Sequence, residues 1–127
     1  SNQLLSYCVR TSVTHKKHRD NTINFATNLV KLVPHPDIYT LAMRAHHING
    51  DTESVLEYFS IISARHVLSP LHYELLLTSL ARAERIDETK SYFEDYQQEF
   101  VVNPQLCGKL IGIFTKNNHI RAALYYL

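Results

Sequence analysis

Glycine and proline are scarce in this sequence, with three and four residues among 127. So few chain-breaking residues argue against a flexible or disordered chain, and 45% hydrophobic and 20% charged residues are ordinary for a globular protein. An excess of one charge is also missing, because the net charge at pH 7 is +1. Overall basicity therefore gives no sign of nucleic-acid binding. The length suits one domain with its own core.

Long apolar runs are absent as well. No stretch approaches the ~20 apolar residues that a membrane-spanning helix needs, so we expect no membrane contact. The chain does not begin like a secretion signal or an organelle-targeting peptide.

Three of the four prolines share a fixed spacing. Pro36, Pro70 and Pro104 lie thirty-four residues apart, which suggests an internal repeat. Two of them follow a residue that can cap a helix, Ser69 and Asn103. A capping side chain accepts hydrogen bonds from the free backbone amides of the first turn. Proline lacks a backbone N–H, but at the first helical position that group would have no partner within the helix. Each of these pairs therefore predicts a helix start.

The apolar residues follow the same spacing. Each unit has a first stripe at i, i+3, i+4 and i+7, which is one face of a helix, and then a second stripe. The first stripes are Leu5, Cys8, Val9 and Ser12; Tyr39, Ala42, Met43 and His46; Tyr73, Leu76, Leu77 and Leu80; and Cys107, Leu110, Ile111 and Phe114. The second stripes are Asn21, Asn24, Phe25 and Asn28; Val55, Tyr58, Phe59 and Ile62; Thr89, Tyr92, Phe93 and Tyr96; and Ala123, Tyr126 and Leu127. Each unit is therefore predicted to form two helices and a turn.

Such helix pairs cannot bury their stripes alone, so neighbouring pairs must stack. We expect an all-α fold, an α-α superhelix (solenoid) with a period of 34 residues. Residues 1–127 would form a single helical-repeat domain, with units 1–35, 36–69, 70–103 and a truncated unit 104–127. Because Leu127 ends the chain inside an apolar stripe, we expect a fragment of a longer array.

The helix boundaries follow from these units. In the first unit we expect a helix at 3–14, a turn at the basic cluster 15–19 and a second helix that ends near Leu32. The later helices are expected at 36–48, 52–65, 70–83, 86–100, 104–116 and from 119 onward.

The cysteines and histidines are expected to pack in the core or to lie in solvent, and not to form disulfides or metal sites. Cys8 and Cys107 stand on the apolar stripes, so we expect buried, reduced thiols and an intracellular compartment. The eight histidines lack cysteine or carboxylate partners at ligand spacing, and His46 stands on an apolar stripe. No catalytic motif is present. We therefore expect no metal, no other cofactor and no enzyme activity.

Charge is divided unevenly between the two sets of helices. The first helices carry five cations against two carboxylates, and the second helices carry five against eight. The charges of the first set are Arg10, Arg44, Arg82, Lys109 and Lys116 against Asp37 and Glu74. If a solenoid places the two sets on opposite surfaces, this near-neutral chain has one basic and one acidic surface. Chance is the alternative explanation, because moving a few charges would remove the difference.

The pattern resembles the pentatricopeptide repeats, in degenerate form, over nearly the whole chain. The shared features are an early aromatic residue, a bulky pair in the first helix, a glycine in the turn and a Leu-Phe-like pair in the second helix. Here these are Tyr39 and Tyr73; Leu76-Leu77 and Leu110-Ile111; Gly50; and Tyr58-Phe59, Tyr92-Phe93 and Tyr126-Leu127. The period is one residue short of the family's, and Glu84 and Asn118 replace the turn glycine. Tetratricopeptide repeats are the second choice, since bulky residues stand where they have a small one.

The resemblance implies an RNA-binding module of an organellar protein, in a mitochondrion or a plastid with the mitochondrion as first choice, that acts in RNA processing, stability or translation. It also implies protein partners in a larger ribonucleoprotein assembly. Repeat proteins of this kind read about one base of single-stranded RNA per unit with two or three side chains. Carried over to this chain, the base-reading positions are Ser6 with His35, Thr40 with Ser69, Glu74 with Asn103, and Gly108.

Four cations share repeat positions near these residues. Arg10 corresponds to Arg44, and Arg82 corresponds to Lys116. Such side chains suit RNA phosphates, which carry affinity without sequence information, although simple solvation is the alternative. None of the reading pairs matches the combinations of Asn, Ser or Thr with Asn or Asp that are informative in the family. A second hypothesis therefore stays open, a protein-interaction scaffold of tetratricopeptide type that binds a peptide or a partner helix.

Overall fold

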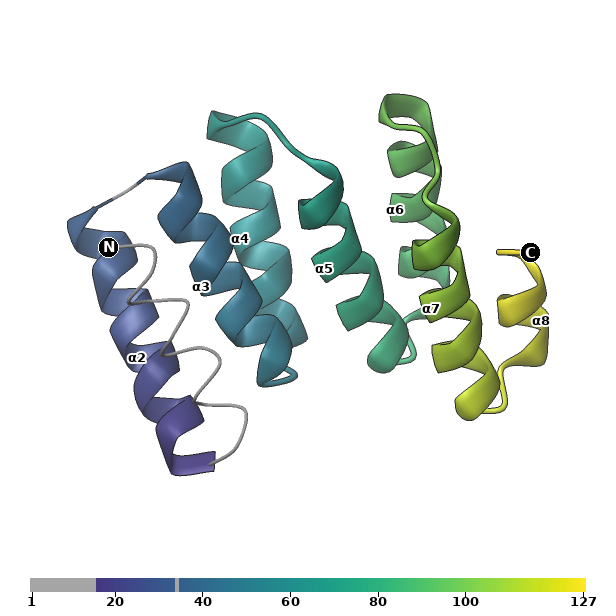
Figure 1. The fold of residues 1–127 in the computed structure, drawn as a ribbon, viewed down its shortest axis with the longest axis horizontal. Coiled ribbons are helices and arrows are strands. Elements are labelled where there is room, and N and C mark those ends of the chain that lie inside the picture. Colours follow the sequence, from purple (N-terminus) through teal and green to yellow (C-terminus); the bar gives the residue numbers. More distant parts are fainter. Residues whose placement is uncertain (1–15, 34) are drawn as a thin grey trace. The chain divides into compact units, whose positions relative to one another are not determined.

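The structure is a computed structural model that describes residues 16–33 and 35–127. Within these residues the fold is all-helical and has no strands (Figure 1), so the prediction of an all-α fold is confirmed. The helices are α2 (Lys16–Leu32), α3 (Pro36–Ile48), α4 (Thr52–Arg65), α5 (Pro70–Arg82), α6 (Ile86–Glu99), α7 (Pro104–Lys116) and α8 (Ile120–Leu124). The helix expected at 3–14, with Cys8, lies outside the described residues. None of the described helices has the length and apolar character that crossing a membrane requires.

The chain divides into two compact units, the first ending at Leu68 and the second beginning at Ser69. From here on, the first and second unit mean these two parts of the chain and no longer the predicted repeats. In the first unit, α3 packs against both α2 and α4. In the second unit, α5 packs against α6 and α7, and α7 packs against α8. Figure 1 shows α5 and α7 side by side, as two neighbouring first helices of the predicted pairs.

Proline opens three of the helices, as the sequence predicted. The first residues of α3, α5 and α7 are Pro36, Pro70 and Pro104. The ring fixes a helical φ, and the missing N–H would have had no partner in the first turn. The three helices are equal in length, at 13 residues each.

The turn inside each helix pair contains a residue in the left-handed conformation. The angle φ is +76° at Gly50, +61° at Glu84 and +64° at Asn118. Glycine adopts this conformation without steric cost, asparagine tolerates it, and glutamate is strained in it. All three turns therefore use one backbone geometry, although only Gly50 has the side chain that it favours.

The predicted apolar stripes of α3 and α4 form the core of the first unit. All eight residues are buried: Tyr39, Ala42, Met43, His46, Val55, Tyr58, Phe59 and Ile62. The second unit buries most of its predicted stripes: Tyr73, Leu76, Leu77, Leu80, Thr89, Phe93, Tyr96, Leu110, Phe114, Ala123 and Tyr126. Tyr92 and Ile111 are half-buried, and Leu127 is exposed. Cys107 is a free thiol, but it is half-buried where the stripe predicted a buried side chain.

The prediction for α2 was wrong in two respects. The expected turn at 15–19 does not form, because the helix already begins at Lys16 and continues to Leu32. The expected buried stripe is exposed, with 42% exposure at Phe25 and exposed side chains at Asn21, Asn24 and Asn28. Ala26, in contrast, is fully buried.

The spacing from α2 to the next helices differs from the predicted period. Three residues separate α2 from α3, whereas four separate α4 from α5 and α6 from α7. Among the α2 residues whose side chains are described, the buried and half-buried ones are Ile23, Ala26, Thr27, Leu29 and Val30. All of these except Leu29 lie thirty-two residues before a residue of the α4 stripe. A fixed spacing of thirty-four residues therefore selected the wrong face of this helix.

Candidate nucleic-acid interface

The second unit holds several residues predicted to contact RNA on two neighbouring helices. Arg82 and Lys116 are the last residues of α5 and α7, and both side chains are exposed. A cation in the last turn also interacts favourably with the helix macrodipole. The two side chains therefore occupy the same place on two helices that pack against each other.

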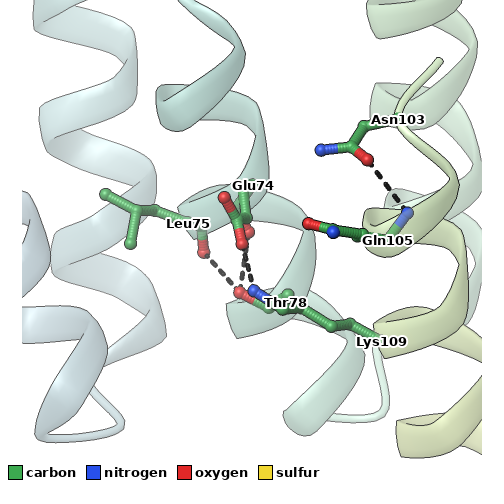
Figure 2. A network of polar contacts seen from close by, with 6 residues as sticks. All are labelled: Glu74, Leu75, Thr78, Asn103, Gln105 and Lys109. Atoms are coloured by element: carbon green, nitrogen blue, oxygen red, sulfur yellow. Dashed lines mark hydrogen bonds and ion pairs between the residues drawn. The ribbon is translucent and has the colours of Figure 1, made fainter.

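Glu74 and Lys109 join these two helices by an ion pair. Figure 2 shows the Lys109 ammonium, from α7, donating to the Glu74 carboxylate of α5. The pair lies at the surface, with the Lys109 side chain 57% exposed and the Glu74 side chain 33% exposed. The predicted reading residue Glu74 is thus brought beside the Gly108-Lys109 stretch. Sequence reasoning missed the pair, because thirty-five residues separate its members and only helix packing brings them together.

Two of the predicted reading positions are helix caps. His35 Nδ1 accepts a hydrogen bond from the Asp37 N–H at 3.1 Å in front of α3. Asn103 Oδ1 accepts one from the Gln105 N–H at 2.9 Å in front of α7, as drawn in Figure 2. Both side chains are exposed. Their acceptor atoms satisfy free amides of the first turn, which is a structural role.

Ser69 and Thr40 also bond within their own helices. The Ser69 backbone N–H donates to His72 Nδ1 at 2.9 Å, and the Ser69 hydroxyl lies 3.1 Å from the same nitrogen. Burial lowers the pKa of His72, which favours the neutral ring that accepts this hydrogen bond. The Thr40 hydroxyl donates to the Pro36 carbonyl at 3.0 Å and is half-buried.

Two of the other predicted residues, Gly108 and Arg44, lie among the described residues. Gly108 is exposed on α7, and a side chain added there would meet nothing within 4 Å. Arg44 is half-buried on α3, in the first unit. Ser6 and Arg10 lie outside the described residues.

The carboxylates of the second unit gather on another helix. Five of them are exposed on α6: Asp87, Glu88, Glu94, Asp95 and Glu99. The same helix has one cation, Lys90, which lies 4.8 Å from the centre of the Tyr125 ring, directly after α8. On α5 and α7 the charges are three cations and one carboxylate, Glu74. In this unit α6 therefore carries an excess of negative charge, and α5 and α7 together carry an excess of positive charge.

A cavity of about 620 Å³ lies on the side of α6 and α8. Lys90, His119, Arg121 and Tyr125 are among its lining residues. His119 Nε2 lies 2.8 Å from Glu84 Oε1, so this ring already has a charged partner. The cavity contains none of the residues predicted to bind RNA.

Neither a metal centre nor a relative indicates the function. Among residues 16–33 and 35–127, no three His, Cys, Asp or Glu side chains lie close enough together to hold a metal ion. The sequence matches no known protein-family model, and no curated protein is similar enough to count as a relative. Function is therefore inferred from the residues of this chain and their geometry.

Proposed function

We propose that α3–α4, α5–α6 and α7–α8 are units of an α-α solenoid and that their first helices bind single-stranded RNA. The period of 34 residues is supported by the helix starts at Pro36, Pro70 and Pro104 and by the left-handed residues at 50, 84 and 118. The resemblance to pentatricopeptide repeats favours a module of a mitochondrial protein. Its role would be RNA processing, stability or translation within a ribonucleoprotein assembly.

The observation that carries the proposal is the charge on two adjacent helices. α5 and α7 pack side by side and present Arg82, Lys109 and Lys116. The carboxylates of this unit stand mainly on α6. A phosphate backbone is attracted to clustered cations and repelled by carboxylates, so an RNA strand would cross α5 and α7.

Sequence readout would be weak in this arrangement. The side-chain acceptors of His35 and Asn103 cap helices, and Gly108 has no side chain. Since phosphate contacts carry affinity and base contacts carry specificity, we expect binding with little preference among RNA sequences.

The test is a double substitution, Arg82→Ala with Lys116→Ala, measured with labelled single-stranded RNA over a range of salt concentrations. Each lost phosphate contact lowers the salt slope by about 0.7 for a single strand, so two contacts lower it by about 1.4. The matched control is Arg65→Ala with Arg121→Ala, which removes two exposed cations from second helices. Equal losses in the two double variants, with helicity unchanged, would refute this placement of the interface.

A protein-interaction scaffold is the second candidate, and exposed valines at one repeat position favour it. Val33, Val67 and Val101 precede the three proline-led helices at the same position, with 47%, 90% and 94% exposure. Exposed apolar side chains in a repeated position suit a protein partner better than a phosphate backbone. Binding to a partner through them would respond little to salt, whereas RNA binding would weaken steeply.

A further inference from the structure

We propose that Glu74 limits the affinity of the α5–α7 surface for RNA, because it occupies Lys109 and must release it before a phosphate can bind. The inference rests on the proposed function. A carboxylate at position 74 is expected to repel phosphate, and the structure adds that this carboxylate is paired with Lys109. Glu74 thus acts as an intramolecular competitor of the RNA backbone.

Lys109 lies where either the Glu74 carboxylate or an RNA phosphate can bind its ammonium group. Its ammonium reaches across from α7 to the Glu74 carboxylate on α5, on the two helices that also carry Arg82 and Lys116 (Figure 2). More than half of the Lys109 side chain is exposed. A phosphate can therefore approach the ammonium from solvent without unfolding either helix.

The exchange is energetically feasible because surface ion pairs are weak. Solvent screening and side-chain entropy leave exposed pairs with little net stability. A phosphate of RNA also gains from the release of condensed counterions, which a carboxylate in a folded protein does not offer. RNA can therefore displace Glu74, but at a loss of affinity relative to an unoccupied Lys109.

The remaining contacts of Glu74 would survive this exchange. Thr78 donates its hydroxyl to the backbone carbonyls of Glu74 at 2.7 Å and of Leu75 at 3.4 Å (Figure 2). These bonds use the main chain and leave the carboxylate group uninvolved. Rotation of the Glu74 side chain away from Lys109 therefore needs no change in α5.

The pair belongs to this part of the chain alone and is no general feature of the predicted repeat. Thr40 and Gly108 stand thirty-four residues before and after Glu74, and neither carries a charge. Thirty-four residues before Lys109 stands Leu75. A competing carboxylate at this position thus lowers the affinity for RNA at one repeat only, and substituting it changes that one site.

The experiment compares the wild-type chain with Glu74→Gln, using labelled single-stranded RNA of mixed sequence at several salt concentrations. Glutamine keeps the length of the side chain and removes its charge. Because Lys109 no longer has to leave a carboxylate before it binds a phosphate, Glu74→Gln should bind RNA more tightly, by at most about fivefold, the upper range for an exposed ion pair. Thermal unfolding checks that the variant is folded.

The matched control is Glu88→Gln on α6. Glu88 is also an ion-paired glutamate, with its Oε1 2.7 Å from Arg85 Nε. Both substitutions change the net charge equally, so only the place of the charge differs. Glu74→Gln in a Lys109→Ala background is the second control, and there the gain in affinity should disappear.

The outcomes separate the inference from the proposed function. A gain for Glu74→Gln that exceeds the gain for Glu88→Gln and depends on Lys109 supports the inference. Binding by the wild type with equal affinity in Glu74→Gln overturns the inference and leaves RNA binding standing. Absence of binding in both folded proteins at low salt overturns the proposed function, and the inference falls with it.

Discussion

His46 is a buried histidine near the end of α3. Its Nδ1 lies 3.3 Å from Asp51 Oδ2, yet no described group forms a well-aligned hydrogen bond with that nitrogen. The ring stacks on Tyr58, with 5.4 Å between the ring centroids. Burial lowers the pKa of His46, and the nearby Asp51 carboxylate opposes this only in part. The folded chain therefore favours the neutral ring.

We predict that this residue makes the first unit sensitive to acid. The usual pKa of 6.5 applies in the unfolded chain, which binds the proton more readily than the folded chain does. Stability should therefore fall as the pH drops below about 6.5, and His46→Phe should reduce this loss because it keeps a ring and removes the titration. Thermal unfolding of both proteins from neutral to acidic pH measures the difference.

Some acid sensitivity should remain in His46→Phe. Burial alone would raise the pKa of Asp51, but hydrogen bonds from Ser54 together with the nearby His46 ring outweigh it, and the net shift is downward. The hydrogen bonds from Ser54 remain in His46→Phe. Burial also lowers the pKa of His72 in the second unit. Protonation of either group at acidic pH lowers the stability of the folded chain, because the unfolded chain binds these protons more readily. Parallel pH profiles for the wild type and His46→Phe would show that His46 contributes nothing.

Burial of single residues was predictable, but their polar partners were not. Tyr73 stands on a predicted stripe and is buried, at 3% exposure. Its hydroxyl lies 3.5 Å from Glu99 Oε1, and burial together with that carboxylate raises the pKa of Tyr73 to about 12. Periodicity identifies the buried face of a helix. It cannot show which side chain of another helix faces it, and the pair of Glu74 with Lys109 was missed for the same reason.

At the scale of helices, the first residue of a helix was more predictable than the distance between the buried stripes of neighbouring repeats. The helix starts at Pro70 and Pro104 followed from local chemistry, because a capping residue and a proline act within one turn. The prediction of the buried face of α2 was wrong because it was carried over from another repeat at a fixed distance in the sequence. Four of the buried and half-buried side chains of α2 lie two residues off that distance. Two residues turn a helix by about 200°, so the buried face changes.

The turns give a second prediction at this scale. Gly50→Ala should destabilise the first unit by ~1–2 kcal/mol, because a side chain at φ +76° meets the following carbonyl oxygen. Gly112→Ala is the control, inside α7, with open space where the new methyl group would lie. It should stabilise the chain by roughly 0.5–1 kcal/mol through helix propensity. Denaturant titration measures both changes.

Opposite signs for these two alanines are the decisive result. A loss of stability at both positions would mean that α7 needs its glycine for some other contact. No loss at Gly50 would mean that the turn of α3 and α4 relaxes out of the left-handed conformation without cost.

At the scale of the whole molecule, each compact unit has its own core. In the first unit, Met43, Val55 and Ile62 are fully buried on α3 and α4. In the second unit, Leu110 and Phe114 of α7 are fully buried. In arrays of helical repeats, stability is roughly a sum of local terms and neighbour contacts. The two units should therefore open separately before the whole chain unfolds.

Hydrogen exchange on two matched variants tests this prediction. Leu110→Ala removes a fully buried side chain from the second unit, and Ile62→Ala removes one from the first, each at a cost of about 2–5 kcal/mol. Leu110→Ala should lower amide protection mainly in α5 to α8, and Ile62→Ala mainly in α3 and α4. If either substitution lowers protection equally throughout both units, the chain unfolds as one cooperative body, and the separate cores do not act as independent units of stability.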